Sequence, residues 1–208
     1  LYATLAERGF FPIEELHTYG TSPGRLMGHP VRAVPGVELP TGSLGHGLSL
    51  GVGFALGARL EGRDRRVAVL VGDGELQEGS CWEAAMSGAS LALGNLLAVV
   101  DRNGLQQSAS TEAAVRLEPL AERWRSFGWR VAEVDGHDHA ELRRAMADPG
   151  PAVAQPTVVI ARTVKGHGWP AAADRVAAHY ARLSPPASAR AHRAIDAARA
   201  RDTGAGAQ

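Results

Sequence analysis

Short continuous runs of apolar, β-branched residues recur along the chain and predict strands. They cover residues 67–71, 96–100 and 157–164, and a fourth, more mixed run covers residues 130–134. A continuous apolar run is typical of a parallel strand that is covered on both faces, whereas a half-exposed strand alternates apolar and polar residues. The three continuous runs therefore predict strands buried on both faces of a parallel sheet.

Stretches with helical character separate these strands. The stretch 43–60 is apolar nearly all round and rich in Gly and Ala, which predicts a buried helix that neighbouring backbones approach closely. Strands that alternate with helices predict an α/β fold with a doubly wound, mostly parallel sheet and helices on both faces. The other helices are expected at residues 1–8, closed by Gly9, and at residues 78–93, 118–127 and 139–147, with a short turn at 14–17 and a loop at 18–41.

The domain organisation predicted from this alternation is simple. We expect one domain over residues 1–183, followed over residues 184–208 by a short helix and a disordered tail. The chain opens at Leu1 without an initiator Met, already within an expected helix, so either the sequence is a fragment or its first segment is missing.

Composition narrows the class of protein. Hydrophobic residues make up 45% of the 208 residues, and 22 basic residues balance 22 acidic ones, which gives no electrostatic reason to expect nucleic acid or a membrane as partner. No apolar run approaches the roughly 18 residues that a membrane span needs. The single cysteine, Cys81, cannot form an intrachain disulfide, so we expect a cytoplasmic protein.

Candidate chemistry lies where two predicted neighbouring strands end. Gly72-Asp73-Gly74-Glu75 follows one strand and Asp101-Arg102-Asn103 follows the next. In an open parallel sheet, ligands sit outside the carboxyl ends of strands, so we expect Asp73 and Asn103 to lie side by side at that edge. A carboxylate and an amide oxygen suit a hard divalent cation, and the flanking glycines let backbone N–H groups approach a phosphate. A Gly-Asp-Gly sequence alone more often marks an ordinary strand-to-helix turn, but together with Asn103 it favours a metal-bound diphosphate.

At this point the sequence resembles the transketolase family, through its amino-terminal, thiamine-diphosphate-binding domain. The Gly-Asp-Gly motif with Asn about 30 residues later is the thiamine-diphosphate motif, and the resemblance extends over residues 1–183. The segments that carry it are TGSLGHGLSLGVGFALG, VGDGELQEGSCWEAA, DRNGLQQS, LEPLAERWRSFGW, VDGHDHAEL and PTVVIARTVKGHG.

The resemblance implies roles for individual residues. It implies that the metal, Mg²⁺ or Ca²⁺, is held by the side chains of Asp73 and Asn103 and by the backbone carbonyl of Leu105. His29 and His179 are implied as catalytic residues close to the substrate, although His29 is also compatible with an ordinary loop histidine. The residues implied to contact or line thiamine diphosphate, apart from the metal ligands, are Leu44, Gly45, Gly72, Gly74, Glu75 and Glu78, of which Glu75 and Glu78 are also implied to face a partner across an interface.

Departures from the family pattern affect three positions. Arg102 stands where the family often has Asn or Asp, and its charge would either repel the metal or help to neutralise the diphosphate. His179 lies in Ala-His-Tyr rather than Trp-His-Gly, and His167 replaces a more usual Lys. An early Lys-Gly-His segment of the family would lie just before Leu1.

The resemblance also implies a partner, because the pyrimidine-binding and carboxy-terminal domains of the family do not fit into 208 residues. We expect a separate chain that carries them, an α₂β₂ assembly, and transfer of a two-carbon ketol unit between sugar phosphates, with the single chain inactive alone. The alternatives are a subunit of a 2-oxo acid dehydrogenase or of a deoxyxylulose-phosphate-synthase-like enzyme, or a non-catalytic scaffold. A nucleotide-binding dehydrogenase domain is disfavoured, since no G-x-G-x-x-G follows the first strand.

Overall fold

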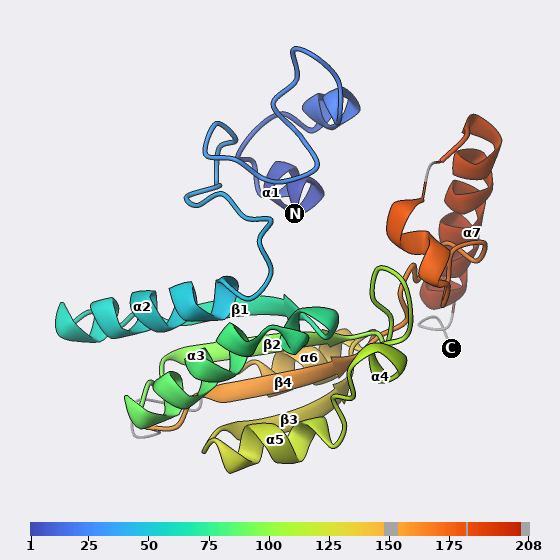
Figure 1. Cartoon of the computed structure of the whole chain (residues 1–208). Helices are drawn as coiled ribbons and strands as arrows, with labels where there is room; N and C mark the ends of the chain where they lie inside the picture. Colours follow the sequence, from blue (N-terminus) through green and yellow to red (C-terminus); the bar gives the residue numbers. More distant parts are fainter. Residues whose placement is uncertain (148–153, 182, 205–208) are drawn as a thin grey trace. The chain divides into compact units, whose positions relative to one another are not determined.

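The computed structural model describes residues 1–147, 154–181 and 183–204, and the chain divides into two compact units, residues 1–44 and 45–208. The second unit is built on four parallel strands (Figure 1). The strands are β1 (Val67–Gly72), β2 (Leu96–Arg102), β3 (Arg130–Asp135) and β4 (Thr157–Arg162), in the order β1-β2-β4-β3.

The sheet confirms the predicted α/β fold with a parallel sheet. Helices α2 and α3 pack against each other, and α2 packs on β1. Helix α5 contacts β3, while α6 contacts β3 and β4 and lies on the other side of the sheet from α2 and α3 (Figure 1). The helices of this unit are α2 (Gly47–Leu60), α3 (Gly79–Ser90), α4 (Thr111–Ala114), α5 (Leu120–Ser126), α6 (His139–Ala145) and α7 (Pro185–Gly204), with 3₁₀ helices η2 (Gly74–Gln77) and η3 (Val176–Tyr180).

The main core is a layer of side chains between the sheet and the helices α2, α3 and α5. Val71, Ala98, Val100 and Ile160 all belong to it. Trp124 is fully buried there and meets Trp129 edge to face, with 4.8 Å between the ring centroids. The tryptophans thus fill the layer between α3, α5 and the sheet, where large rings bury much apolar area.

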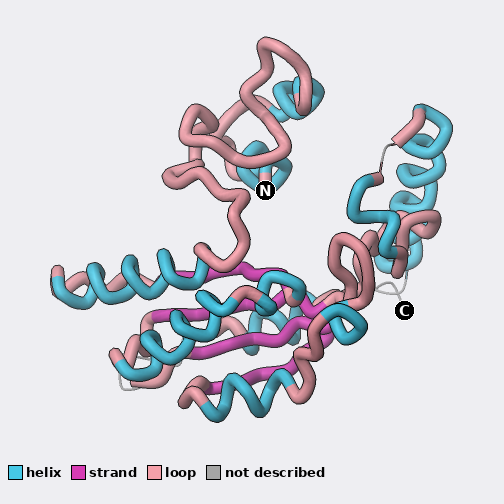
Figure 2. The backbone as a smooth tube through the Cα atoms, in the orientation of Figure 1, coloured by secondary structure: helices cyan, strands magenta, loops and turns pink. Residues whose placement is uncertain are grey.

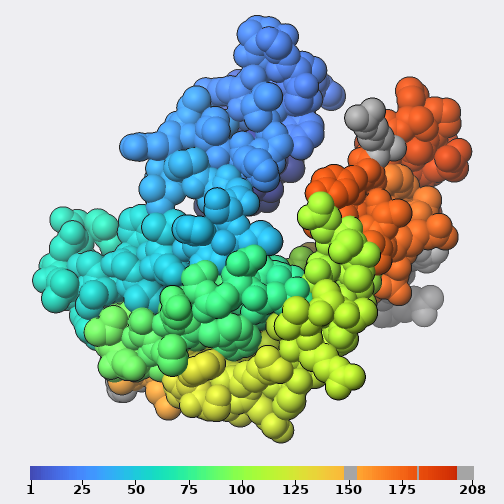
Figure 3. Space-filling view, viewed as in Figure 1, coloured from blue at the N-terminus to red at the C-terminus, as the bar shows by residue number. Residues whose placement is uncertain are grey.

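Two burial expectations are wrong, and both overestimate burial. Helix α2 begins at Gly47 rather than at residue 43, and it is buried on one side only, because Phe54 remains 53% exposed. Strand β1 is an edge strand, and its Leu70 is 72% exposed, so β1 is not covered on both faces. In the space-filling view the outer side of α2 (turquoise) lies at the surface (Figure 3).

The first unit has its own small core and is mostly loop (Figure 2). It contains α1 (Tyr2–Glu7), followed by Gly9 with φ 79°, and the 3₁₀ helix η1 (Ile13–Thr18). Its buried residues are Ala6, Phe11, Leu26 and Val34.

The carboxy-terminal helix is longer than the short helix expected, since α7 runs over Pro185–Gly204. The four residues of the expected tail, 205–208, lie outside the described residues. Among the helices that the structure describes, none is both long and apolar enough to cross a membrane.

Candidate metal and diphosphate site

Asp73 lies at the carboxyl end of β1 and is the most enclosed acidic residue of the candidate site. Its side chain is 1% exposed. The Gly74 N–H donates to Oδ1 (2.8 Å) and the Gly104 N–H donates to Oδ2 (2.6 Å). The pairing of Gly72 with Asp101 brings the ends of β1 and β2 together, as parallel neighbours should be. A buried carboxylate is thereby held at the sheet edge by backbone donors from both strand ends.

Arg102, the last residue of β2, forms an ion pair with this carboxylate. Its Nη1 donates to Asp73 Oδ2 (2.9 Å) and to Thr111 Oγ1 (2.7 Å). Its Nη2 donates to Glu112 Oε1 and Glu118 Oε1, both at 3.0 Å. The side chain of Arg102 is only 8% exposed, whereas those of Glu112 and Glu118 reach the surface.

The charges of this cluster are mutually stabilised. Burial acts to lower the pKa of the Arg102 guanidinium, but hydrogen bonds to Glu118 and Asp73 outweigh burial and raise the pKa above its ordinary value. The backbone N–H of Leu120, and then Arg102, lower the pKa of the Glu118 carboxyl. Both groups therefore stay ionised near neutral pH.

Asn103 lies next to this cluster, but its side chain turns toward its own strand end. Its Nδ2 donates to Asp101 Oδ1 (3.3 Å), and its Oδ1 accepts from the Leu105 N–H (3.0 Å). The sequence predicts that Asp73 and Asn103 lie side by side. In the structure the direct contact with Asp73 comes from Gly104, the residue after Asn103, whose backbone N–H donates a hydrogen bond to the Asp73 carboxylate. Among the described residues no hydrogen bond joins the two side chains, and the role of both as metal ligands stays a prediction.

Gly45 and Glu75 tie a second segment to the same strand end. The Gly45 N–H donates to Glu75 Oε1 (3.0 Å), and the Gly72 N–H donates to Glu75 Oε2 (3.3 Å). Gly45 has φ 80°, and an added Cβ would come within 2.8 Å of the Glu78 Cβ, so only glycine fits there. The resemblance implies that Glu75 faces a partner, but in the structure both its carboxylate oxygens accept backbone N–H groups of its own unit.

The donor atoms at this edge suit a hard divalent cation that bridges a diphosphate. A carboxylate offers about four lone-pair sites, of which Asp73 uses three, and the amide oxygen of Asn103 uses one of its two. No group of three or more His, Cys, Asp or Glu is placed to hold a metal in the part of the chain that the structure describes, so the set would rely on amide and backbone oxygens. At this edge of the sheet, within the described residues, the buried Oε1 of Gln106 is an acceptor without a hydrogen-bond partner.

Gln106 packs against Gly74, the glycine at which a phosphate would approach the backbone. A Cβ added to Gly74 would lie 3.0 Å from the Gln106 Cβ and 3.8 Å from its Oε1. Because Gly74 has no side chain, the unpartnered Oε1 of Gln106 lies close to the Gly74 backbone, next to Asp73. The residues present fit a metal-bound diphosphate.

The first unit contains two of the sequence-predicted site residues, His29 and Leu44. The His29 ring is exposed and packs against Gly42, whose added Cβ would lie 3.1 Å from the ring. Leu44 is exposed as well. Both residues belong to the unit of residues 1–44, whereas Asp73 belongs to the other unit, so their approach to the Asp73 edge stays a prediction.

His179 lies on η3 and contacts Tyr180 edge to face, with 5.0 Å between the centroids. The partial burial of the ring and the Lys165 ammonium lower the pKa of the His179 imidazole, which keeps it neutral near pH 7. His179 is not among the residues that contact Asp73 or Arg102, and its catalytic role stays a prediction. His167 stacks instead on His137, at 3.8 Å between centroids.

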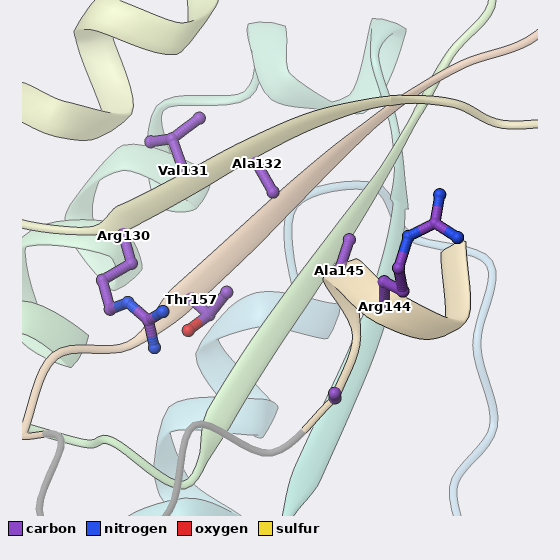
Figure 4. Close-up of a pocket in the computed structure, with 7 residues that line it drawn as sticks. Arg130, Val131, Ala132, Arg144, Ala145 and Thr157 are labelled. Carbon is purple, nitrogen blue, oxygen red and sulfur yellow. The ribbon is translucent and has the colours of Figure 1, made fainter. Parts of the chain in front are cut away.

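A pocket of about 320 Å³ lies at the opposite ends of the strands (Figure 4). Arg130 and Thr157, the first residues of β3 and β4, line it together with Arg144 of α6. Ligands of open parallel sheets bind outside the carboxyl ends, and the side chain of Arg144 points away from Thr157 in this view. We therefore place the candidate site at Asp73.

Sequence reasoning missed four members of the site: Gln106, Thr111, Glu112 and Glu118. They come together because residues 104–111 fold back, with an antiparallel bridge between Leu105 and Ser110. No local pattern marks these residues, since their positions depend on that turn and on where Arg102 points.

Comparison with known proteins gives a consistent result. The family model described as the thiamine diphosphate binding domain of transketolase matches residues 1–198. An apulose-4-phosphate transketolase subunit of Phocaeicola vulgatus is 44% identical over 168 residues, which cover 81% of this chain and 60% of that subunit. The 6-deoxy-6-sulfo-D-fructose transketolase subunit SqwG of Clostridium sp. is 37% identical over 185 residues, which cover 88% of this chain and 67% of the relative.

A solved structure supports the same fold. The transketolase of Pichia stipitis in complex with sedoheptulose 7-phosphate superposes with a TM-score of 0.81 at 32% identity, covering 88% of this chain and 29% of that protein. The chain thus spans about 60% of the length of the Phocaeicola vulgatus subunit and less than a third of the Pichia stipitis transketolase.

Proposed function

Because the chain belongs to the transketolase family, through its thiamine-diphosphate-binding domain, we propose that it holds thiamine diphosphate and a divalent metal for two-carbon transfer between sugars. The buried Asp73 at the carboxyl end of β1, beside the end of β2, is the observation that carries the proposal. Thiamine diphosphate supplies the carbanion chemistry when it is bound, and the protein orients it.

The residues would divide this work. Asp73, Asn103 and the carbonyl of Leu105 would hold the metal, either Mg²⁺ or Ca²⁺, since both prefer oxygen ligands. Gly72 and Gly74 would let the diphosphate approach the backbone. Glu75 would fix the Gly45 segment beside them, as its two hydrogen bonds indicate. The remaining proposed cofactor and substrate contacts are Leu44, Glu78, His29 and His179.

A partner chain is part of the proposal. Both of the relatives described above carry the word subunit in their names, and exposed apolar side chains on α2, Leu50 and Phe54, offer surface that a partner would cover. We propose that the partner carries the pyrimidine-binding and carboxy-terminal domains, that the assembly is α₂β₂, and that the single chain is inactive and cytoplasmic. The donor is proposed to be a ketose, in keeping with the ketoses in the names of both relatives, and phosphorylated, as in the first of them.

Calorimetric titration of thiamine diphosphate into the chain mixed with its partner tests the cofactor site. Binding should require Mg²⁺, vanish with a chelator, and be lost in Asp73→Ala. Asp64→Ala, which removes an exposed aspartate from the loop before β1, is the matched control and should bind normally. Binding that survives Asp73→Ala would refute the site.

The reaction itself is tested by donor choice. The reconstituted complex should release an aldose phosphate from a ketose phosphate donor and leave pyruvate untouched. Turnover of pyruvate would favour a 2-oxo acid dehydrogenase subunit or a deoxyxylulose-phosphate-synthase-like enzyme. Cofactor binding without turnover of either donor would favour a scaffold role.

A further inference from the structure

We propose that Arg102 is an internal counter-ion of Asp73, which keeps divalent metal from binding tightly until the diphosphate arrives. This inference rests on the proposed function, because it takes Asp73 as the metal ligand. It assigns Arg102 as a positioning residue: it acts on the metal through the Asp73 carboxylate and not by touching the cofactor.

The hydrogen bonds of Arg102 favour this role over direct contact with the diphosphate. A guanidinium has four Nη hydrogens. Arg102 donates one of them to each of four acceptors: Asp73, Thr111, Glu112 and Glu118. All four Nη hydrogens are thus used, so an Nη contact with a phosphate oxygen would require one of these bonds to break; the fifth donor of the side chain is the Nε hydrogen.

The position of the charge explains why it should weaken metal binding. Arg102 Nη1 lies 2.9 Å from Asp73 Oδ2, and both side chains are almost fully buried. A metal at this carboxylate would meet a positive charge that solvent screens poorly. The negative diphosphate would offset that repulsion, so metal and diphosphate should each strengthen the binding of the other by the same factor.

Glu112 and Glu118 hold the guanidinium from the opposite side. Each accepts one Nη2 hydrogen at 3.0 Å, and both carboxylates are partly exposed. The positive charge of Arg102 is therefore balanced by three carboxylates, those of Asp73, Glu112 and Glu118. Removing one of these acceptors should leave more of that charge on Asp73 and weaken metal binding further.

Mn²⁺ titration of the 208-residue chain, followed by the electron paramagnetic resonance signal of free Mn²⁺, tests the inference without any turnover. Arg102→Met should bind Mn²⁺ alone about tenfold more tightly than the unaltered chain. Arg102→Lys keeps the charge and should stay within about threefold of it. Adding thiamine diphosphate should raise the Mn²⁺ affinity of the unaltered chain by a larger factor than that of Arg102→Met.

Glu118→Gln makes the test independent of the fold of the Arg102 variants, because it alters a half-exposed side chain. It should weaken Mn²⁺ binding about twofold to fivefold. Unchanged or tighter binding by Glu118→Gln, or no gain in a folded Arg102→Met, overturns the inference. The circular dichroism of each variant identifies the folded ones.

The Asp73→Asn exchange separates this inference from the proposed function. If Asp73→Asn abolishes Mn²⁺ binding and Arg102→Met does not strengthen it, the metal site stands and the counter-ion role falls. If Arg102→Met binds Mn²⁺ equally well with and without Asp73→Asn, the metal lies elsewhere, and both fall.

Discussion

Helix α2 rests on β1 through the backbone of Gly51, and replacing this glycine by alanine tests that close approach. A Cβ at Gly51 would collide with Cγ2 of Val69 and lie 3.4 Å from Cδ1 of Leu96. Gly53, two residues further along the same helix, is exposed, and a Cβ there meets nothing within 4 Å. Gly53→Ala is therefore a matched control with the same chemical change.

The magnitude follows from two opposing terms. Glycine to alanine inside a helix stabilises it by about 1 kcal/mol at either position. An extra methyl group forced into a packed contact costs about 1–3 kcal/mol. We expect Gly53→Ala to raise the free energy of unfolding by about 1 kcal/mol, and Gly51→Ala to leave it unchanged or lower it by up to about 2 kcal/mol.

Urea unfolding followed by tryptophan fluorescence measures both variants, since Trp82, Trp124 and Trp129 lie in or against the core that α2 covers. The difference between the two variants removes the shared helix term and isolates the contact with Val69. If Gly51→Ala proves as stable as Gly53→Ala, α2 does not approach β1 this closely, and the packing described for Gly51 is wrong.

Three further predictions concern single residues. Burial, with Glu75 and Glu78 nearby, raises the pKa of the Cys81 thiol to about 12, so its reaction with a disulfide reagent at pH 8 should be about 10³-fold slower in the folded chain than in urea. Asp138 caps α6, and the N–H groups of Glu141 and Ala140 lower the pKa of its carboxyl below 3.8. Its stabilising effect should be complete above that pH and be lost as the pH falls through the lowered pKa, so the difference in melting temperature between Asp138→Ala and the unaltered chain should shrink there. Gly74→Ala adds a methyl group where the diphosphate is proposed to approach the backbone, so it should weaken thiamine diphosphate binding by about tenfold in calorimetry. Because this methyl would also lie 3.0 Å from the Gln106 Cβ, a modest fall in melting temperature should accompany the loss.

The sequence predicts β1, β2 and β4 well because their apolar runs are continuous, although the run that predicts β4 extends two residues beyond its end at Arg162. The prediction that β1 and β2 are neighbours with Asp73 at their shared edge is confirmed by the pairing of Gly72 with Asp101. The start of α2 is predicted too early, because hydrophobicity does not reveal that Gly45 takes φ 80° and leaves the helical region. Register and apolar runs follow from local pattern, but backbone conformation at single glycines does not.

The Arg102 cluster shows a second kind of limit. The sequence places a positive charge beside Asp73 but leaves open whether it repels a metal or neutralises a phosphate. That choice depends on Thr111, Glu112 and Glu118, which the turn at 104–111 and the segment after it bring back to the strand end. Side-chain partners nine to sixteen residues away follow from the folded loop, and no periodicity encodes them.

The two wrong expectations about α2 and β1 both overestimate how far their side chains are buried. The pattern of residues 43–60 and 67–71 is that of segments covered on all sides, yet Phe54 and Leu70 are exposed. They lie on different layers, because Val69 faces α2 and its neighbour Leu70 must point to the other face of the sheet. A single exposed apolar side chain such as Leu70 is common on protein surfaces, whereas Leu50 and Phe54, one turn apart on α2, together form apolar surface that another protein can cover. The exposed side of α2 is therefore the surface of this unit that the proposed partner would cover, and the exposure of Leu70 on the other face of the sheet carries no such argument by itself.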